Sequence, residues 1–139
     1  MITYTTQGGN VRDLFYIEQK DICFKDIAHS LSFQCRFNGH TKRFYSVAEH
    51  SIILRDLVRE ESGIQNLDRR MAAILHDAAE CYLGDITNPV KEYLCISKTS
   101  EETILKEVFA SFRVPYSAFD EVLKAMDKGI RIVQGFFLI

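Results

Sequence analysis

The sequence has no excess of positive charge, which argues against binding to duplex nucleic acid. Its 139 residues include 17 lysines and arginines against 19 aspartates and glutamates, for a formal net charge of -2. A protein that neutralises many backbone phosphates needs a surplus of cations. Any anionic ligand must therefore be bound by a few local basic groups.

Long apolar segments are also missing. No stretch approaches the roughly 20 apolar residues that a membrane-spanning helix needs. The first residues, MITYTTQGGN, contain no basic region followed by an apolar one, as a secretory leader would. We therefore expect a soluble, cytoplasmic protein with no membrane partner.

The cysteines form no CxxC pair, so neither a thiolate zinc site nor a dithiol redox motif is expected. Buried, reduced thiols are the preferred interpretation for Cys23, Cys35, Cys81 and Cys95. Repeats and low-complexity tracts are absent too. Because 47% of the residues are hydrophobic, the chain can build one substantial core, and we predict a single domain over residues 1–139.

What the sequence does contain is a series of amphipathic segments, which predicts an all-α helical bundle. Ser46 and Glu49 form a capping box for a helix over about 47–61. Asn66 or Asp68 can cap a second helix that runs to residue 83, where Gly84 would end it. Residues 2–15, around Gly8, Gly9 and Asn10, suit a small N-terminal β-hairpin.

The other predicted helices have similar signals at their starts. Asp26 is a candidate N-cap for residues 27–34, and Asn88-Pro89 predicts a short helix through residue 93. Thr99 and Glu102 form a second capping box. The last helix should open near residues 115–117, with an apolar stripe that contains Phe119, Val122, Leu123, Met126 and Ile130.

Polar residues interrupt the apolar stripes of three of these helices. His50 lies in the stripe formed by Val47, Leu54, Leu57 and Val58. Taken alone, it is more typical of a hydrogen-bonded core histidine than of a metal ligand.

The next two helices carry further polar groups. His76, Asp77 and Glu80 are spaced so that all three can line one side of a helix, although a partly exposed polar face would look the same. Asp127 lies at the margin of the last stripe, where a lone carboxylate is more often a cap or an ion-pair partner.

The presence of two histidines and two carboxylates on three helices favours a common metal site over the separate interpretation of each residue. Burying imidazoles and carboxylates is costly unless they are paired or bound to a metal. One divalent cation held by His50, His76, Asp77 and Asp127 would account for all of them. Nitrogen and oxygen ligands without a thiolate suit Mn, Co, Mg, Zn or Fe.

These residues resemble the H...HD...D signature of the HD-domain phosphohydrolases. The similarity extends to the segments DIAHSLS, CRFNGH, FYSVAEHS and ILHDAAECYLGDITNPVK, and it covers about residues 26–127. It implies the all-α HD fold and hydrolysis of phosphate esters, mostly nucleotides, by a metal-activated water. The family's usual pattern continues after the last aspartate with a longer polar segment, whereas this chain ends in KGIRIVQGFFLI.

The resemblance also implies roles for individual residues. Asp77 is expected to contact the metal and position water, while Glu80 and Asp85 are expected to move protons or bind a further metal. From the residues alone, Asp85 could equally cap the turn before Ile86. Substrate contacts are expected from Arg36, His40 and Lys91 for phosphate, and from Phe37 and Pro89 as pocket walls.

The favoured function is therefore release of phosphate from (deoxy)nucleoside 5′-monophosphates. Two alternatives remain: release of triphosphate from a dNTP, which calls for more cations around the phosphate tail, and a non-catalytic nucleotide or metal sensor. The modest number of basic residues near the motifs favours the monophosphate. The apolar end, residues 136–139, covers either the core or a subunit interface, and the latter predicts a homo-oligomer.

Overall fold

The amphipathic segments form the helices that make up most of the fold, which a computed structural model describes for residues 3–8 and 11–139. Turns and short 3₁₀ segments, such as Phe37–Gly39 and Tyr116–Ala118, connect them. The predicted all-α class is confirmed. The helices are α1 (Phe24–Phe33), α2 (Val47–Ser62), α3 (Leu67–Leu75), α4 (Glu80–Leu83), α5 (Asn88–Tyr93), α6 (Lys98–Ser111) and α7 (Glu121–Leu138).

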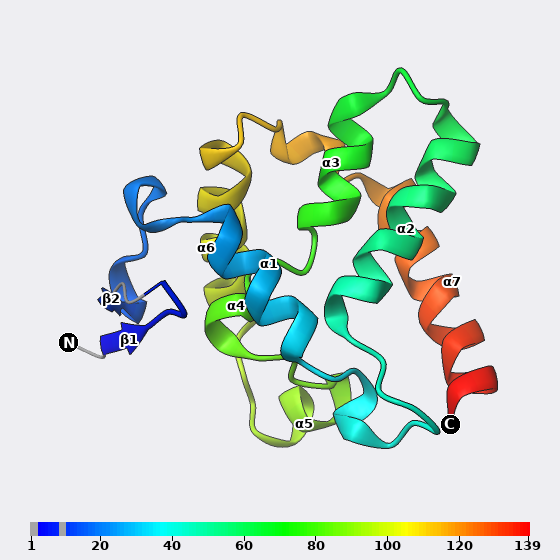
Figure 1. Cartoon of the computed structure of the whole chain (residues 1–139), viewed down its shortest axis with the longest axis horizontal. Helices are drawn as coiled ribbons and strands as arrows, with labels where there is room; N and C mark the ends of the chain where they lie inside the picture. The colour runs from blue at the N-terminus through cyan, green and yellow to red at the C-terminus, as the bar shows by residue number, and fades with distance from the viewer. Residues whose placement is uncertain (1–2, 9–10) are drawn as a thin grey trace.

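The small N-terminal hairpin is also confirmed. Strand β1 (Thr3–Thr5) pairs antiparallel with β2 (Val11–Asp13), with Thr5 opposite Val11. Of the three predicted turn residues, Gly9 and Asn10 lie outside the described residues. The hairpin lies at one end of the molecule, and α2 and α7 lie at the other (Figure 1).

The core lies where α2 packs against α1, α3 and α7. Leu54 and Val58 of α2 and Leu123 of α7 are completely buried there. On its other side, α3 packs against α6, which contributes the buried side chain of Val108. Helices α2, α3, α6 and α7 therefore each bury an apolar stripe, as the 3.6-residue periodicity predicts.

Two of the helix starts are capped as predicted. Ser46 Oγ accepts a hydrogen bond of 3.0 Å from the Glu49 N–H, and Asn66 Oδ1 accepts one of 3.2 Å from the Arg69 N–H. Each cap satisfies a backbone N–H that has no partner within the helix. These caps fix the starts of α2 and α3, the two helices that lead to His50 and His76.

Three other caps were predicted at the wrong residue. Asp26 lies in the first turn of α1, which begins at Phe24. Thr99 and Asn88 are helical, and the preceding Ser97 and Thr87 are the N-caps. At α5 and α6 the start moves by one or two residues, because neighbouring Ser, Thr and Asn residues can take the same role. At α1 the N-cap is Cys23, whose side chain forms no cap hydrogen bond.

The predicted single helix over residues 68–83 is wrong, because turns over residues 76–79 separate α3 from α4. His76 Nδ1 is 2.7 Å from the carbonyl oxygen of Ala73, the acceptor that a continuous helix would offer to the Asp77 N–H. Bonds of the 3₁₀ type follow, including Ala78 N–H to Leu75 O and Glu80 N–H to Asp77 O. The break occurs at the predicted metal ligands.

Three predicted burials are also wrong. Leu57 and Val122 were placed on buried stripes but are exposed, because each lies at the solvent side of its helix. Cys95 is exposed, Cys23 and Cys35 are half-buried, and Cys81 is buried as expected.

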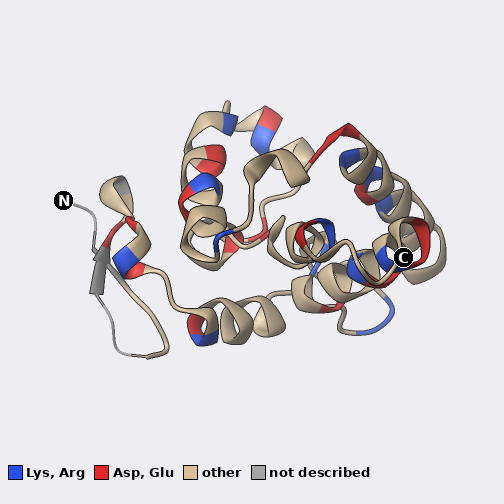
Figure 2. Ribbon diagram, turned by 90° about the horizontal axis from the view of Figure 1, so that it is seen from above, with Lys and Arg blue, Asp and Glu red and all other residues tan. Residues whose placement is uncertain are grey.

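The charged residues are mixed over the surface. Basic and acidic segments lie side by side on the same helices (Figure 2), in keeping with the net charge of -2. Over the described ranges, 3–8 and 11–139, no helix has the length and apolar character to span a membrane.

Candidate metal centre

Three helical elements bring the predicted metal ligands together. His50 comes from the first turns of α2, His76 and Asp77 from the break after α3, and Asp127 from α7. Ligand atoms of His50, His76 and Asp127 lie within 4.8 Å of one another, so this group could hold a metal ion. Asp77 Oδ2 adjoins it, 3.1 Å from His76 Nε2 and 3.7 Å from His50 Nε2.

The spacing of these atoms suits a single cation. Asp127 Oδ1 is 2.7 Å from His50 Nε2 and 3.3 Å from His76 Nε2. Ligands about 2.1 Å from an ion and at right angles to each other are about 3 Å apart. The measured distances lie around this value.

The tautomer of His76 turns a lone pair toward the cluster. Its Nδ1 is 2.7 Å from the carbonyl oxygen of Ala73, which can only accept, so Nδ1 carries the hydrogen. In the neutral ring, Nε2 therefore presents a lone pair to the oxygens of Asp77 and Asp127. A proton or a metal cation must lie between these groups to offset their repulsion.

The pKa shifts also indicate that positive charge is stabilised at this cluster. Burial would lower the pKa of His76, but the adjacent Asp77 and Asp127 carboxylates raise it well above its ordinary value. Burial would raise the pKa of Asp127, but hydrogen bonds from both histidines hold it below its usual range. The pKa of Asp77 is lowered mainly by His76, again against the effect of burial.

Asp77 has a buried oxygen that is available to a ligand. Among the residues that the structure describes, no group forms a hydrogen bond with Oδ2. A buried carboxylate oxygen without such a bond is costly. A metal ion or an ordered water at this position would satisfy it.

The cluster lies at a cleft of about 630 Å³. Seven of the predicted site residues line this cleft in addition to His76 and Asp127, while His50 is completely buried behind them. The seven are Arg36, Phe37, Asp77, Glu80, Asp85, Pro89 and Lys91.

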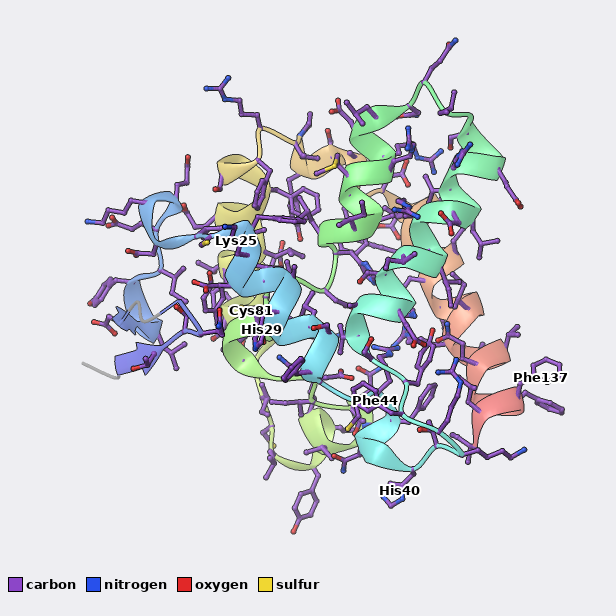
Figure 3. The ribbon with its side chains drawn as sticks, viewed as in Figure 1. Lys25, His29, His40, Phe44, Cys81 and Phe137 are labelled. Atoms are coloured by element: carbon purple, nitrogen blue, oxygen red, sulfur yellow. The ribbon has the colours of Figure 1, made fainter. Side chains whose placement is uncertain are left out.

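His40 is the one predicted site residue that the structure does not bring to the centre or the cleft. It is exposed and lies at the outer edge of the molecule (Figure 3). The chain leaves the cleft after Phe37, within the 3₁₀ turn at Phe37–Gly39, whose residues have positive φ. The prediction of His40 as a phosphate contact is therefore not supported.

Arg36 is buried between two carboxylates at the cleft. Its Nη1 is 3.7 Å from Asp77 Oδ2 and 3.8 Å from Asp85 Oδ2. These distances are too long for hydrogen bonds. In the described residues its buried Nε has no hydrogen-bond partner either. Arg36 therefore has donors free for an anion, whereas Lys91 is already paired with Glu101 at 2.9 Å.

Glu80 is a buried acid that stays protonated at neutral pH. The residue is 6% exposed, and burial, together with the negative charges of Asp77 and Asp85, raises its pKa to about 10. Burial likewise raises the pKa of Asp85, against the opposing effect of Arg36. A neutral carboxylic acid at a cleft can donate a proton.

Replacing Glu80 by glutamine should stabilise the protein increasingly as pH rises. The unfolded chain releases the Glu80 proton near pH 4.5, whereas the folded chain retains it to about pH 10. The contribution of Glu80 to the free energy of unfolding therefore falls with pH across this range, and the glutamine variant escapes that loss. Thermal unfolding of chelator-treated protein between about pH 5 and 9 should show a widening difference.

The matched control is Glu60→Gln, an exposed change on α2. It should leave the pH dependence of the wild-type protein unchanged. A constant difference between wild-type and Glu80→Gln protein at every pH would contradict the raised pKa.

Sequence reasoning missed several residues of the site. Gln134 contacts His50, and it is a polar interruption in the apolar segment IRIVQGFF, seven residues after Asp127. That spacing puts both on one face of a helix, so the signal was present. The other cleft residues that were missed lie mainly on α6, α7 and the 3₁₀ turn before α7: Lys98, Glu101, Glu102, Leu105, Tyr116, Phe119, Lys124, Lys128, Arg131 and Ile132.

Comparison with known proteins gives two relatives. The chain is 39% identical over 99 residues to the uncharacterized protein YfdR of Escherichia coli (strain K12), which covers 71% of this chain and 52% of YfdR. It is 46% identical over 87 residues to the uncharacterized protein RCAP_rcc00048 of Rhodobacter capsulatus, over 60% of this chain and 44% of that protein. The chain thus spans about half the length of these relatives. No family model matches it.

Proposed function

We propose that this chain is a metal-dependent phosphohydrolase of the HD-domain type that releases phosphate from (deoxy)nucleoside 5′-monophosphates. One observation carries the proposal. Two histidines and two carboxylates converge beside a cleft that also contains a buried arginine and a protonated glutamate. Binding alone would not need the additional acid.

The ligand set supports a divalent ion at His50, His76, Asp77 and Asp127. Such an ion would lower the pKa of a water molecule toward ~7 and offset charge on the phosphoryl oxygens. The buried Oδ2 of Asp77 would accept a hydrogen bond from the attacking water and orient it toward phosphorus. Asp77 thus has a positioning task in addition to its place among the ligands.

Arg36 is the residue best placed to bind the phosphate. Its donors are incompletely satisfied by Asp77 and Asp85, and a guanidinium can bind two phosphoryl oxygens at once. Its burial means that the charge acts in a medium of low dielectric constant, where attraction to an anion is stronger than in water.

Glu80 would complete the reaction as the general acid. The water oxygen bonds to phosphorus, the P–O5′ bond breaks, and Glu80 delivers its proton to the departing O5′. One proton of the water stays on the phosphate, and the other is released and restores the acid form of Glu80. The products are a nucleoside and orthophosphate. The raised pKa of Glu80 keeps that proton in place at neutral pH.

The remainder of the cleft suits a nucleoside. Apolar and aromatic side chains form walls that a sugar and a base could contact. They are Phe37, Ile86, Pro89, Leu105, Tyr116, Phe119 and Ile132.

A specific observation favours the triphosphate alternative as a second candidate. Lys124, Lys128 and Arg131 lie four and three residues apart on α7, so they share one face, and all three line the cleft. The sequence-based preference for a monophosphate counted only the basic residues near the motifs, so it did not include these three. Such a row could bind the phosphate tail of a dNTP, and hydrolysis would then release triphosphate and a nucleoside.

Replacing both Lys124 and Lys128 by alanine tests this row. If it binds a polyphosphate tail, the KM for a dNTP should rise by roughly tenfold or more, because each charge-assisted contact is worth about 1.5–3 kcal/mol. The KM for the monophosphate should change by less than about twofold. Lys20→Ala with Lys25→Ala removes the same charge outside the cleft and should affect neither. Equal effects on both substrates would remove the support for a triphosphate.

The function is tested by incubating the protein with (deoxy)nucleoside mono- and triphosphates plus manganese or cobalt, and separating the products by chromatography. Nucleoside with orthophosphate is the expected result. Nucleoside with triphosphate would promote the second candidate. No product with any metal would overturn the proposal in favour of a non-catalytic sensor.

A further inference from the structure

Helix α7 contacts both ring nitrogens of His50. Asp127 Oδ1 is 2.7 Å from Nε2, and Gln134 Oε1 is 3.2 Å from Nδ1. The two α7 residues are seven positions apart, so their side chains lie on one face about two turns from each other. His50 is completely buried and Gln134 is 8% exposed, so water cannot readily replace either contact.

Tyr45 contacts the end of the Gln134 amide that faces away from His50. The Gln134 Nε2 group donates to the hydroxyl oxygen of Tyr45, a residue that is 1% exposed. This leaves the carbonyl oxygen of the amide toward the imidazole. Tyr45 is itself held in place, since its carbonyl accepts the Arg36 N–H at 2.8 Å and the Arg43 guanidinium lies over its ring.

The direction of these bonds determines the tautomer of His50. An amide oxygen can only accept, so Nδ1 carries the hydrogen, and in the neutral ring Nε2 is left with a lone pair that faces Asp77 and Asp127. A reversed amide would present an N–H to Nδ1 and force the hydrogen onto Nε2. A protonated Nε2 cannot bind a metal.

We propose that Gln134 is a positioning residue that fixes the tautomer and ring orientation of His50 for metal binding, and that Tyr45 in turn orients Gln134. This inference rests on the proposed metal site. It explains why a polar side chain is buried near the end of α7 while the neighbouring apolar Val133 and Phe136 are exposed. His76 has the equivalent contact from its own helix, through the carbonyl of Ala73.

The test is cobalt binding to chelator-treated protein, followed by calorimetry and by the visible spectrum of the bound ion. Gln134→Leu removes the acceptor and should weaken cobalt binding by about 10- to 100-fold, the usual effect of losing such a contact. Gln134→Glu keeps an acceptor for the Nδ1 hydrogen and should restore affinity to within a few-fold of wild type. Tyr45→Phe frees the amide to rotate and should give an intermediate loss.

Ile130→Ala is the matched control, because it removes a buried apolar side chain of the same helix that belongs to the hydrophobic core and offers no hydrogen bond to His50. It should lower thermal stability but leave cobalt affinity unchanged. If Gln134→Leu binds cobalt with wild-type affinity, or if Ile130→Ala loses as much affinity as Gln134→Leu, the proposed role of Gln134 is wrong. Either result would leave the metal site itself in place. Should Gln134→Leu fail to fold, unchanged affinity in Tyr45→Phe would also overturn it. Absence of cobalt binding to the wild-type protein would instead reject the metal site itself.

Discussion

Replacing Asp77 by asparagine should reduce phosphate release by roughly 10³-fold or more while leaving the helical fold intact. Asparagine keeps the shape of the side chain but removes the negative charge from the oxygen that lies 3.1 Å from His76 Nε2. The proposed metal supplies several kcal/mol of transition-state stabilisation, and each ~1.4 kcal/mol corresponds to a factor of ten in rate. Initial rates with a deoxynucleoside monophosphate and saturating manganese measure the effect.

The matched control for this change is Asp56→Asn. Asp56 is exposed on α2 and pairs with its neighbour Arg55 at the surface. It should retain wild-type turnover, with circular dichroism confirming that both variants are folded. Wild-type activity in Asp77→Asn would show that the proposed mechanism is wrong.

The Glu80→Gln variant should lose turnover of the natural ester by roughly 100-fold or more, the usual contribution of a positioned general acid. Glutamine preserves the shape of the buried side chain but has no acidic proton for O5′. The loss should depend on the leaving group. With p-nitrophenyl phosphate, whose leaving group needs no proton, the variant should approach the wild-type rate.

This comparison separates an acid from a residue that only shapes the cleft. A structural or metal-binding role for Glu80 would reduce the rates for both esters equally, and that result would contradict the assignment. Asp85→Asn is the informative partner variant, because Asp85 lines the same cleft and was the other candidate acid. If Glu80 is the acid, Asp85→Asn should affect the two esters alike.

The sequence was sufficient to predict the all-α class and the convergence of His50, His76 and Asp127, a group that could hold a metal ion. His50 is recognisable because an imidazole takes a place in the stripe that includes Val47 and Leu54. Helical periodicity determines which face such a residue occupies, so burial follows from local sequence. That His50 would meet Asp127 depended on the packing of α2 against α7, which no local pattern specifies.

The break after α3 could not be predicted from local propensity. The segment MAAILHDAAECYL contains good helix formers and no glycine or proline that would predict a helix end before Gly84. The interruption coincides with the bond between the His76 side chain and the Ala73 carbonyl. A side-chain bond of this kind overrides an intrinsic preference for helix.

The cleft residues on α7 illustrate a different limit. Lys124, Lys128 and Arg131 look in sequence like the solvated face of an amphipathic helix. Their position beside Asp77 and Glu80 follows only from the way α7 crosses α2. Further along the same helix, Phe137 remains exposed at 72% and points away from the bundle (Figure 3). The alternative that residues 136–139 cover the core is thus not supported for Phe137, and self-association stays a prediction.

The most direct test of the central claim is phosphate release from a deoxynucleoside monophosphate by chelator-treated protein during titration with manganese. We predict no release without the metal and activity that rises to saturation as the metal binds, with both effects absent in Asp127→Ala. Activity that is unchanged by the chelator, or no activity at any manganese concentration, would contradict a metal-dependent phosphohydrolase.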